Sequence, residues 1–124
     1  RMAASSGDVL SAKAVEINGV KVLAASLENT DAVAMRKLID QLRNQLGSSV
    51  VVLASAESGT VRVAVGVSKD LTARIQAGNL VNFVAQQVGG KGGGRPDFAQ
   101  AGGSQPENVD KALASVAPWV KDNT

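Results

Sequence analysis

Two cations inside a dense run of glycines are the residues of this sequence whose types and spacing could do chemistry. VGGKGGGRPDFAQAGG, residues 88–103, holds seven of the chain's 13 glycines together with Lys91 and Arg95. Glycine has no Cβ atom, so its backbone can approach a ligand closely. Bare backbone N–H groups beside two positive side chains could therefore hold phosphate. Composition leaves a second interpretation equally open, in which the glycines let two backbones cross tightly inside the fold.

The established phosphate-binding motifs do not match this run. A P-loop requires Lys and then Ser or Thr after its last glycine, whereas Gly94 is followed by Arg95 and Pro96. The dinucleotide fingerprint fails too, because its sixth position, counted from Gly90, is Arg95. The run also follows the C-terminal end of an expected helix, where the helix dipole is negative. Any phosphate must therefore be held by backbone N–H groups and the two cations.

Catalytic chemistry has little support in this sequence. The chain contains no Cys and no His, which excludes thiolate nucleophiles, imidazole bases and thiolate or imidazole metal sites. Asp97 lies two residues from Arg95, so a salt link is favoured over a general base. Ser68 and Ser104 have no base near them and are interpreted as helix caps. We therefore predict no catalytic residue, no metal site and no cofactor in this chain.

Composition places the chain among small globular domains. Its 124 residues are enough for one domain. Apolar residues make up 44% and aromatic residues 2%, so stacking platforms for nucleic-acid bases are scarce. The net charge of +2 produces a weak overall field, and anion binding must depend on local placement. No apolar run approaches the roughly 20 residues of a membrane span, and we expect a cytoplasmic location without membrane contact.

The order of apolar runs predicts a mixed sheet packed with helices. Residues 14–17 and 20–26 flank Asn18-Gly19, a dipeptide typical of a two-residue hairpin turn. Residues 50–54 are a continuous β-branched run, which indicates a strand buried on both faces. Valines alternate with other residues from 61 to 67, as in a strand with one polar side. The predicted fold class is α/β (α+β), with about five strands and three to four helices in one domain.

One helix is predicted between the first hairpin and the buried strand. Thr30 can cap it, with Asp31 in its first turn. Residues 35–46 place apolar side chains on one face, and Gly47 ends the helix. Residues 68–71 predict a short helical turn further along the chain.

The remaining helices are predicted on both sides of the glycine run. Asn79 can cap a helix that stops at Gly89. Ser104 and Glu107 have the spacing of a capping box before a last helix. Pro118 is expected to end or kink that last helix near Ala117.

The glycine run also carries a resemblance to a known family. Residues 89–103, GGKGGGRPDFAQAGG, resemble the signature near the C-terminus of alanyl-tRNA synthetases, with Phe98 where that family more usually has Met. Four other stretches resemble the same domain in the same order: INGVKVLAA (17–25), VVVLAS (50–55), GVSKDLTARIQAG (66–78) and ALASVAPWV (112–120). The resemblance implies that residues 14–124 are the C-terminal globular domain, with a glycine-rich loop at 89–94. Residues 1–13 are then expected to be a cut end and the tail of an upstream helical linker.

By this resemblance the chain is a non-catalytic tRNA-binding appendage, related to the accessory domain of DHH-type phosphoesterases. In the synthetases, such a module grips the tRNA elbow and links aminoacylation with editing of mischarged tRNA. The resemblance implies that the parent chain is an ATP-dependent alanine–tRNA ligase, with its ATP and zinc in domains upstream. The implied partners are the tRNA for alanine, the upstream aminoacylation and editing domains, and a second copy in a homodimer. The residues implied to face RNA are Gly89, Gly90, Lys91, Gly92, Gly93, Gly94, Arg95, Lys69 and Arg74.

Two alternatives to RNA binding remain at this stage. The first is a structural or dimerising module of the synthetase that makes no RNA contact. The second is the nucleotide-binding domain of a DHH-type phosphoesterase, which would bind short oligonucleotides or dinucleotides. It fits less well, because those enzymes typically place a histidine after the glycines and this chain has none.

Overall fold

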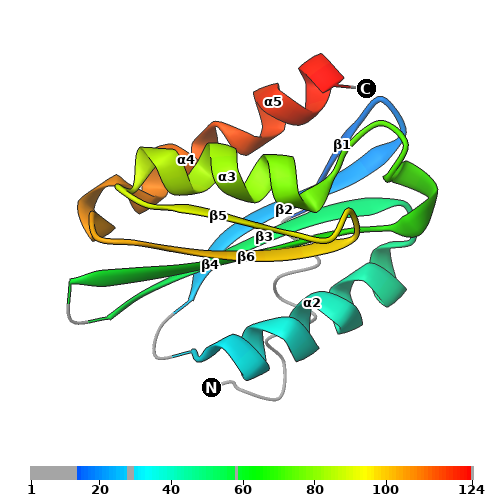
Figure 1. Cartoon of the computed structure of the whole chain (residues 1–124). Coiled ribbons are helices and arrows are strands. Elements are labelled where there is room, and N and C mark those ends of the chain that lie inside the picture. Colours follow the sequence, from blue (N-terminus) through cyan, green and yellow to red (C-terminus); the bar gives the residue numbers. More distant parts are fainter. Residues whose placement is uncertain (1–13, 28–29, 58, 124) are drawn as a thin grey trace.

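A six-stranded sheet with helices on both faces makes up the computed structural model (Figure 1), which describes residues 14–27, 30–57 and 59–123. The strand order is β1-β2-β3-β4-β6-β5. Only the β2–β3 pair is parallel within this sheet, so it is mixed, as predicted, with one strand more than expected. The interpretation of residues 1–13 as an upstream linker lies outside the described residues.

The strands follow the apolar runs, apart from one strand that the sequence did not predict. Asn18 and Gly19 have φ angles of 53° and 82°, which confirms the two-residue turn between the first two strands. The central third strand is buried on both faces, as its unbroken run of β-branched residues predicted. The strands are β1 (Val15–Ile17), β2 (Val20–Leu27), β3 (Ser49–Glu57), β4 (Thr60–Val67), β5 (Lys91–Gly94) and β6 (Phe98–Gly103).

Helix α2 (Ala32–Leu46) is the one helix of the described residues that lies on its face of the sheet (Figure 1). The expectation that Thr30 caps it is wrong, because the Asp31 carboxylate accepts a hydrogen bond from the Ala34 N–H at 2.8 Å. Asp31 has the extended backbone of an N-cap, which brings its short side chain back over the first turn. Gly47, with a φ of 76°, ends the helix as predicted.

Helix α3 (Ala77–Gln87) begins earlier than predicted and lies on the other face. Asn79 is therefore inside its first turn and not its cap. The Ala77 N–H instead donates to the Pro96 carbonyl oxygen at 2.7 Å. The loop before β6 therefore supplies the hydrogen-bond acceptor for the first N–H group of the helix. Gly89, with a φ of 76°, follows the end of the helix as predicted.

The last helical region differs from prediction at both ends. The predicted capping box of Ser104 and Glu107 is absent, because a 3-10 turn (Pro106–Asn108) precedes helix α4 (Val109–Ala114). The Ser104 N–H donates to the Val88 carbonyl oxygen, so this residue is held by the end of α3.

Pro118 neither ends nor kinks its helix where expected. It lies in the first turn of α5 (Val116–Asn123), where a backbone N–H would have no intrahelical partner in any case. The break falls three residues earlier, at Ser115, whose hydroxyl donates to the Ala112 carbonyl oxygen at 2.6 Å.

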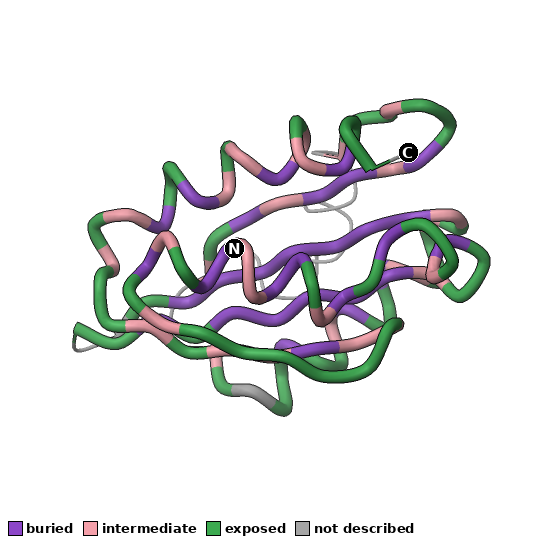
Figure 2. Tube along the Cα trace, turned by 45° about the horizontal axis from the view of Figure 1, so that its top comes forward, coloured by how far each residue is buried: buried purple, intermediate pink, exposed green. Residues whose placement is uncertain are grey.

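Two apolar cores lie on the two faces of the sheet, and Figure 2 shows the buried residues running along its central strands. Helices α3, α4 and α5 cover the larger core. Helix α2 packs on β3 and β4 so closely that a Cβ on Gly66 would lie 2.1 Å from Ile39 Cγ2. The buried members of the α2 core are Leu23, Ala25, Met35, Ile39, Leu42, Val51, Leu53 and Ala64.

Candidate nucleic-acid interface

The glycine run forms an exposed strand at the edge of the sheet. Residues 91–94, expected within a loop, instead form β5, which pairs antiparallel with β6 (Figure 1). All four residues of β5 are exposed. Residues 100–103 lie beside the glycines as part of β6.

Close packing of β5 against β6 accounts for some of these glycines but not for all. A Cβ on Gly90 would lie 1.7 Å from the Gly102 carbonyl oxygen, and one on Gly92 would lie 2.2 Å from Ala101 Cβ. The tight-crossing interpretation is therefore correct at these positions. A Cβ on Gly93 would meet nothing within 4 Å. Packing within the fold does not require glycine at Gly93.

Gly94 is exposed but lies close to the backbones of both neighbouring elements, β6 and α3. A Cβ on Gly94 would lie 2.8 Å from Ala99 Cα in β6. On its other side, a Cβ on Gly78 in α3 would lie 3.3 Å from the Gly94 carbonyl oxygen. At this point β5 therefore lies between α3 and β6, and its backbone is in close contact with the backbones of both.

Several N–H groups that could have held phosphate are used inside the fold. Gly89 and Gly90 donate to α3 carbonyl oxygens at 3.5 and 2.8 Å. The Arg95 N–H donates to the Phe98 carbonyl oxygen at 2.9 Å and closes the hairpin between β5 and β6.

The pairing register shows which N–H groups of β5 remain available. Hydrogen-bonded and non-hydrogen-bonded pairs alternate along an antiparallel ladder. Because Arg95 occupies a hydrogen-bonded pair, Gly93 and Lys91 also direct their N–H groups toward β6. Gly92 and Gly94 direct theirs toward the outer edge. Within residues 89–95, the pairing with β6 and the turns therefore leaves at most these two backbone donors for a ligand.

A hollow of about 320 Å³ lies along this outer edge. Strand β5 runs back beside α3, so that Arg95 lies near the N-terminal end of this helix, where the dipole is positive. The sequence argument considered only the C-terminal end of α3, where the run begins. The hollow is lined by Gln76, Gly78, Asn79, Asn82, Gly92, Gly93, Gly94, Arg95 and Pro96.

A second hollow, of about 380 Å³, lies on the α2 side of the same strand. The Arg36 guanidinium carbon lies 5.1 Å from the centre of the Phe98 ring, as in a cation–π contact. Arg95 lines both hollows and can therefore be reached from either side of β5. The lining residues are Arg36, Gly93, Gly94, Arg95, Phe98, Ala99 and Gln100.

Arg43 lies outside the apolar face of α2 and holds the hairpin of β5 and β6 in place. Its Nη1 donates to the carbonyl oxygens of Val67 and Asp97 at 3.2 and 3.1 Å, and its Nη2 pairs with Asp40 at 2.5 Å. The Val67 N–H also donates to Asp97, at 2.9 Å. The turn that follows Arg95 is thus fixed to both α2 and β4. Sequence periodicity could not show this, because the acceptors are backbone atoms of distant segments.

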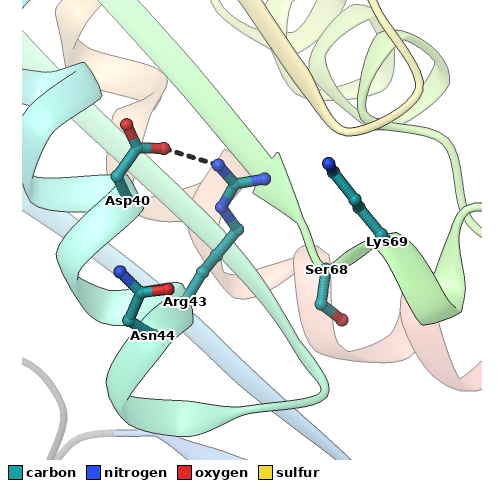
Figure 3. Close-up of a pocket in the computed structure, with 5 residues that line it drawn as sticks. All are labelled: Asp40, Arg43, Asn44, Ser68 and Lys69. Carbon is teal, nitrogen blue, oxygen red and sulfur yellow. Dashed lines mark hydrogen bonds and ion pairs between the residues drawn. The ribbon is translucent and has the colours of Figure 1, made fainter.

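Lys69 belongs to a different hollow from the glycine strand. It begins the short 3-10 turn Lys69–Leu71, which confirms the helical turn predicted there. Figure 3 shows its side chain and that of Arg43 directed into a hollow of about 410 Å³ that Asp40, Asn44 and Ser68 also line. Arg74 is exposed just after this turn. The role of Lys69 and Arg74 in RNA contact stays a prediction.

Asp70 is a structural carboxylate beside this third hollow. The hydroxyl of Ser48 donates to it and lowers its pKa below the ordinary aspartate value, with a smaller contribution from Ser68. The Ser68 hydroxyl also accepts a hydrogen bond from the Ser49 N–H at 3.0 Å. Asp70 therefore ties the 3-10 turn to the start of β3. Within the described ranges, we find no cluster of three acidic side chains that could hold a metal ion.

In the described part of the chain, a mixed six-stranded sheet with an exposed glycine edge has one α-helix on one face and three on the other, which defines a small α+β domain. Residues 19–122 match the sequence profile of the DHHA1 domain, and the chain belongs to the DHHA1 domain family. No helix among the described residues is long and apolar enough to cross a membrane.

Relatives with high sequence identity are alanine–tRNA ligases. The chain is 59% identical over 120 residues to that of Methylibium petroleiphilum and 55% identical over 121 residues to that of Dechloromonas aromatica. These alignments cover 97% and 98% of this chain but only 14% of each relative. The chain therefore spans a small part of the length of the relatives that it matches.

Solved structures show the same fold. The C-Ala domain of the Aquifex aeolicus alanyl-tRNA synthetase superimposes with a TM-score of 0.81 and 26% identity, covering 88% of this chain and 98% of that domain. A pGpG-specific phosphodiesterase from Vibrio cholerae shares the fold alone, with a TM-score of 0.55, 14% identity, and coverage of 94% of this chain and 38% of that one. The resemblance to the C-terminal domain of alanyl-tRNA synthetases is confirmed.

Proposed function

We propose that this domain is a non-catalytic tRNA-binding appendage of an alanine–tRNA ligase. The observation that carries the proposal is the exposed edge strand β5, which presents Lys91 and ends beside Arg95. The ion pairs among the described residues are Lys21–Glu16 and Arg43–Asp40, so both of these exposed cations lack an ionic partner there. Positive side chains beside available backbone N–H groups favour binding of a phosphate backbone.

Within this proposed function, the domain would contact the elbow of the tRNA for alanine. This contact would link aminoacylation with editing of the mischarged product. The relatives' name, alanine–tRNA ligase, and the likeness to a C-Ala domain support this choice of RNA. A few phosphate contacts give modest affinity, and tethering to the aminoacylation and editing domains would raise their effective concentration. A cytoplasmic location and an ATP- and zinc-dependent parent chain are part of the same proposal.

Titration of tRNA at two salt concentrations tests the proposal. Lys91→Ala combined with Arg95→Ala should weaken binding and flatten its salt dependence, because each lost phosphate contact removes about 0.7–0.9 from the logarithmic salt slope. Lys111→Ala combined with Lys121→Ala, in α4 and α5, makes the same change in charge elsewhere and should leave the slope unaltered. Unchanged binding by the first double variant would place the RNA contact on another surface.

Sedimentation of the chain with and without tRNA separates this function from its alternatives. Self-association that tRNA does not alter would support a dimerising module. Binding of a dinucleotide in preference to tRNA would support a nucleotide-binding role. The fold shared with a phosphodiesterase is compatible with that outcome but does not favour it, because the sequence identity is only 14%.

A further inference from the structure

The strand registers bring nine residues of three strands together on one face of the sheet. Helix α2 buries Ala64 and Gly66 on this face, and the part that it leaves exposed is the open face. In β4, β6 and β5, Arg62 lies opposite Gly102, which lies opposite Lys91 on its other side. Directly opposed residues in a sheet have their side chains on the same face. The next two rows of this face are Ala64, Gln100 and Gly93, and then Gly66, Phe98 and Arg95.

Cations occupy three corners of this face, and none of the nine residues is acidic. Arg62 and Lys91 are both exposed and lie two strand spacings apart, or about 10 Å between their Cα atoms. Arg95 lies at the opposite end of β5, about 13 Å from Lys91 at the usual rise per residue. The fourth corner, at Gly66, is covered by α2. Arg36 of α2 extends over the neighbouring Phe98 and adds a fourth positive charge there.

Two glycines and Gln100 lie between these cations on the part of the face that α2 does not cover. Gly102 and Gly93 have no side chains, and both are exposed. Among the described elements, only α2 lies on this side of the sheet, and it packs mainly on β3 and β4. Phe98 is half-buried beneath Arg36, so the face offers no exposed aromatic ring on which an unpaired base could stack.

We propose that this face, with Arg62 and Arg36 completing the charge of Lys91 and Arg95, docks the minor groove of double-stranded RNA. The inference rests on the proposed function and specifies which surface and which form of RNA it uses. The minor groove of A-form RNA is wide and shallow, with 2′-hydroxyl groups and flanking phosphates displayed across it. A floor of Gly102, Gly93 and Gln100, bordered by positive side chains, complements that shape. The minor groove of B-form DNA is narrower and lacks the 2′-hydroxyl groups.

Three oligonucleotides of one sequence test the form of the ligand: a 16-base-pair RNA duplex, one of its single strands, and the corresponding DNA duplex. The unmodified 124-residue chain should bind the RNA duplex most tightly. Equal or tighter binding of the single strand would overturn the proposal.

Two variants test the surface. Arg62→Gln should weaken binding of the RNA duplex severalfold and reduce the salt slope by about one, whereas Lys111→Gln, on α4, should not. Gly93→Leu should abolish most of the binding, because its side chain would stand on the floor from a position where a Cβ meets nothing within 4 Å. An unchanged melting temperature for Gly93→Leu would show that the loss of binding comes from steric obstruction of the face and not from a loss of structure.

The outcomes distinguish the two levels of inference. No binding of tRNA or of any oligonucleotide by the unmodified chain would refute the proposed function itself. Binding that Lys91→Ala and Arg95→Ala weaken, but that Arg62→Gln and Gly93→Leu leave unchanged, would refute only the open face as the docking surface.

Discussion

Alanine substitution at neighbouring glycines of β5 tests directly whether close packing or function demands each glycine. Gly92→Ala would place a Cβ 2.2 Å from Ala101 Cβ and 2.6 Å from the Gln100 carbonyl oxygen. Both contacts are well inside ordinary van der Waals separation, and the nearest groups are backbone or a short side chain that cannot rotate away. Overpacking of this kind costs about 1–3 kcal/mol.

Gly93→Ala is the matched control, because it adds the same atom to the next residue of the same exposed strand. Its Cβ would meet nothing within 4 Å, and Gly93 does not have a positive φ. Alanine at a compatible glycine position stabilises a protein by about 0.4–1 kcal/mol, since the unfolded chain loses conformational freedom.

Thermal unfolding followed by circular dichroism measures both effects. For a chain of this size, 1 kcal/mol corresponds to about 4 °C in melting temperature. Gly92→Ala should therefore lower the melting temperature by about 4–12 °C, and Gly93→Ala should raise it by about 2–4 °C. Equal shifts for the two variants would show that β5 does not pack on β6 as described.

Three further predictions concern side-chain hydrogen bonds that hold α2, the hairpin turn and the 3-10 turn in place. Asp31→Ala should cost about 1 kcal/mol in urea unfolding, because the Ala34 N–H loses its cap. Arg43→Met should cost about 1–3 kcal/mol, because two carbonyl oxygens at the hairpin turn lose a charged donor. Asp70→Asn should destabilise the chain at neutral pH. The lowered pKa of Asp70 means that its contribution is present above the ordinary aspartate range and is lost as the pH falls through the lower folded-state value. The difference between Asp70→Asn and the unmodified chain should therefore vanish in acid.

The elements with strong local signals were predictable from the sequence. The Asn18-Gly19 turn, the helix ending at Gly47 and the buried strand β3 each depend on residues close together in the chain. Their apolar periodicity and turn residues agree with the packing that the fold imposes. Local and tertiary preferences point in the same direction at these positions.

The glycine strand was not predictable as a strand, because glycine has low intrinsic preference for extended structure. Its conformation is imposed by β6 and α3, whose backbones approach at Gly90, Gly92 and Gly94. Pro118 was misjudged for a related reason. Its effect depends on where the helix begins, and the break at Ser115 places it in a first turn.

The open face of β4, β6 and β5 was only partly predictable from the sequence. Lys91 and Arg95 lie within the glycine run and drew attention by proximity, and the structure leaves both exposed. Arg62 and Arg36 lie 29 and 55 residues from Lys91 in the numbering, and only the strand register and the position of α2 bring them to the same surface. Neither the alternation in β4 nor the polar face of α2 distinguishes them from ordinary solvated arginines.

The exposed edge of β5 also bears on how the chain avoids aggregation. An open edge strand can recruit a strand from another molecule, and that addition can continue into fibrils. Here the edge is four residues long, three of them are glycines, and it begins with a lysine and is followed closely by Pro96. Each of these features opposes intermolecular pairing, through charge, a missing N–H donor or poor strand propensity. Valine in place of the glycines would thus endanger colloidal stability even where a larger side chain could be accommodated.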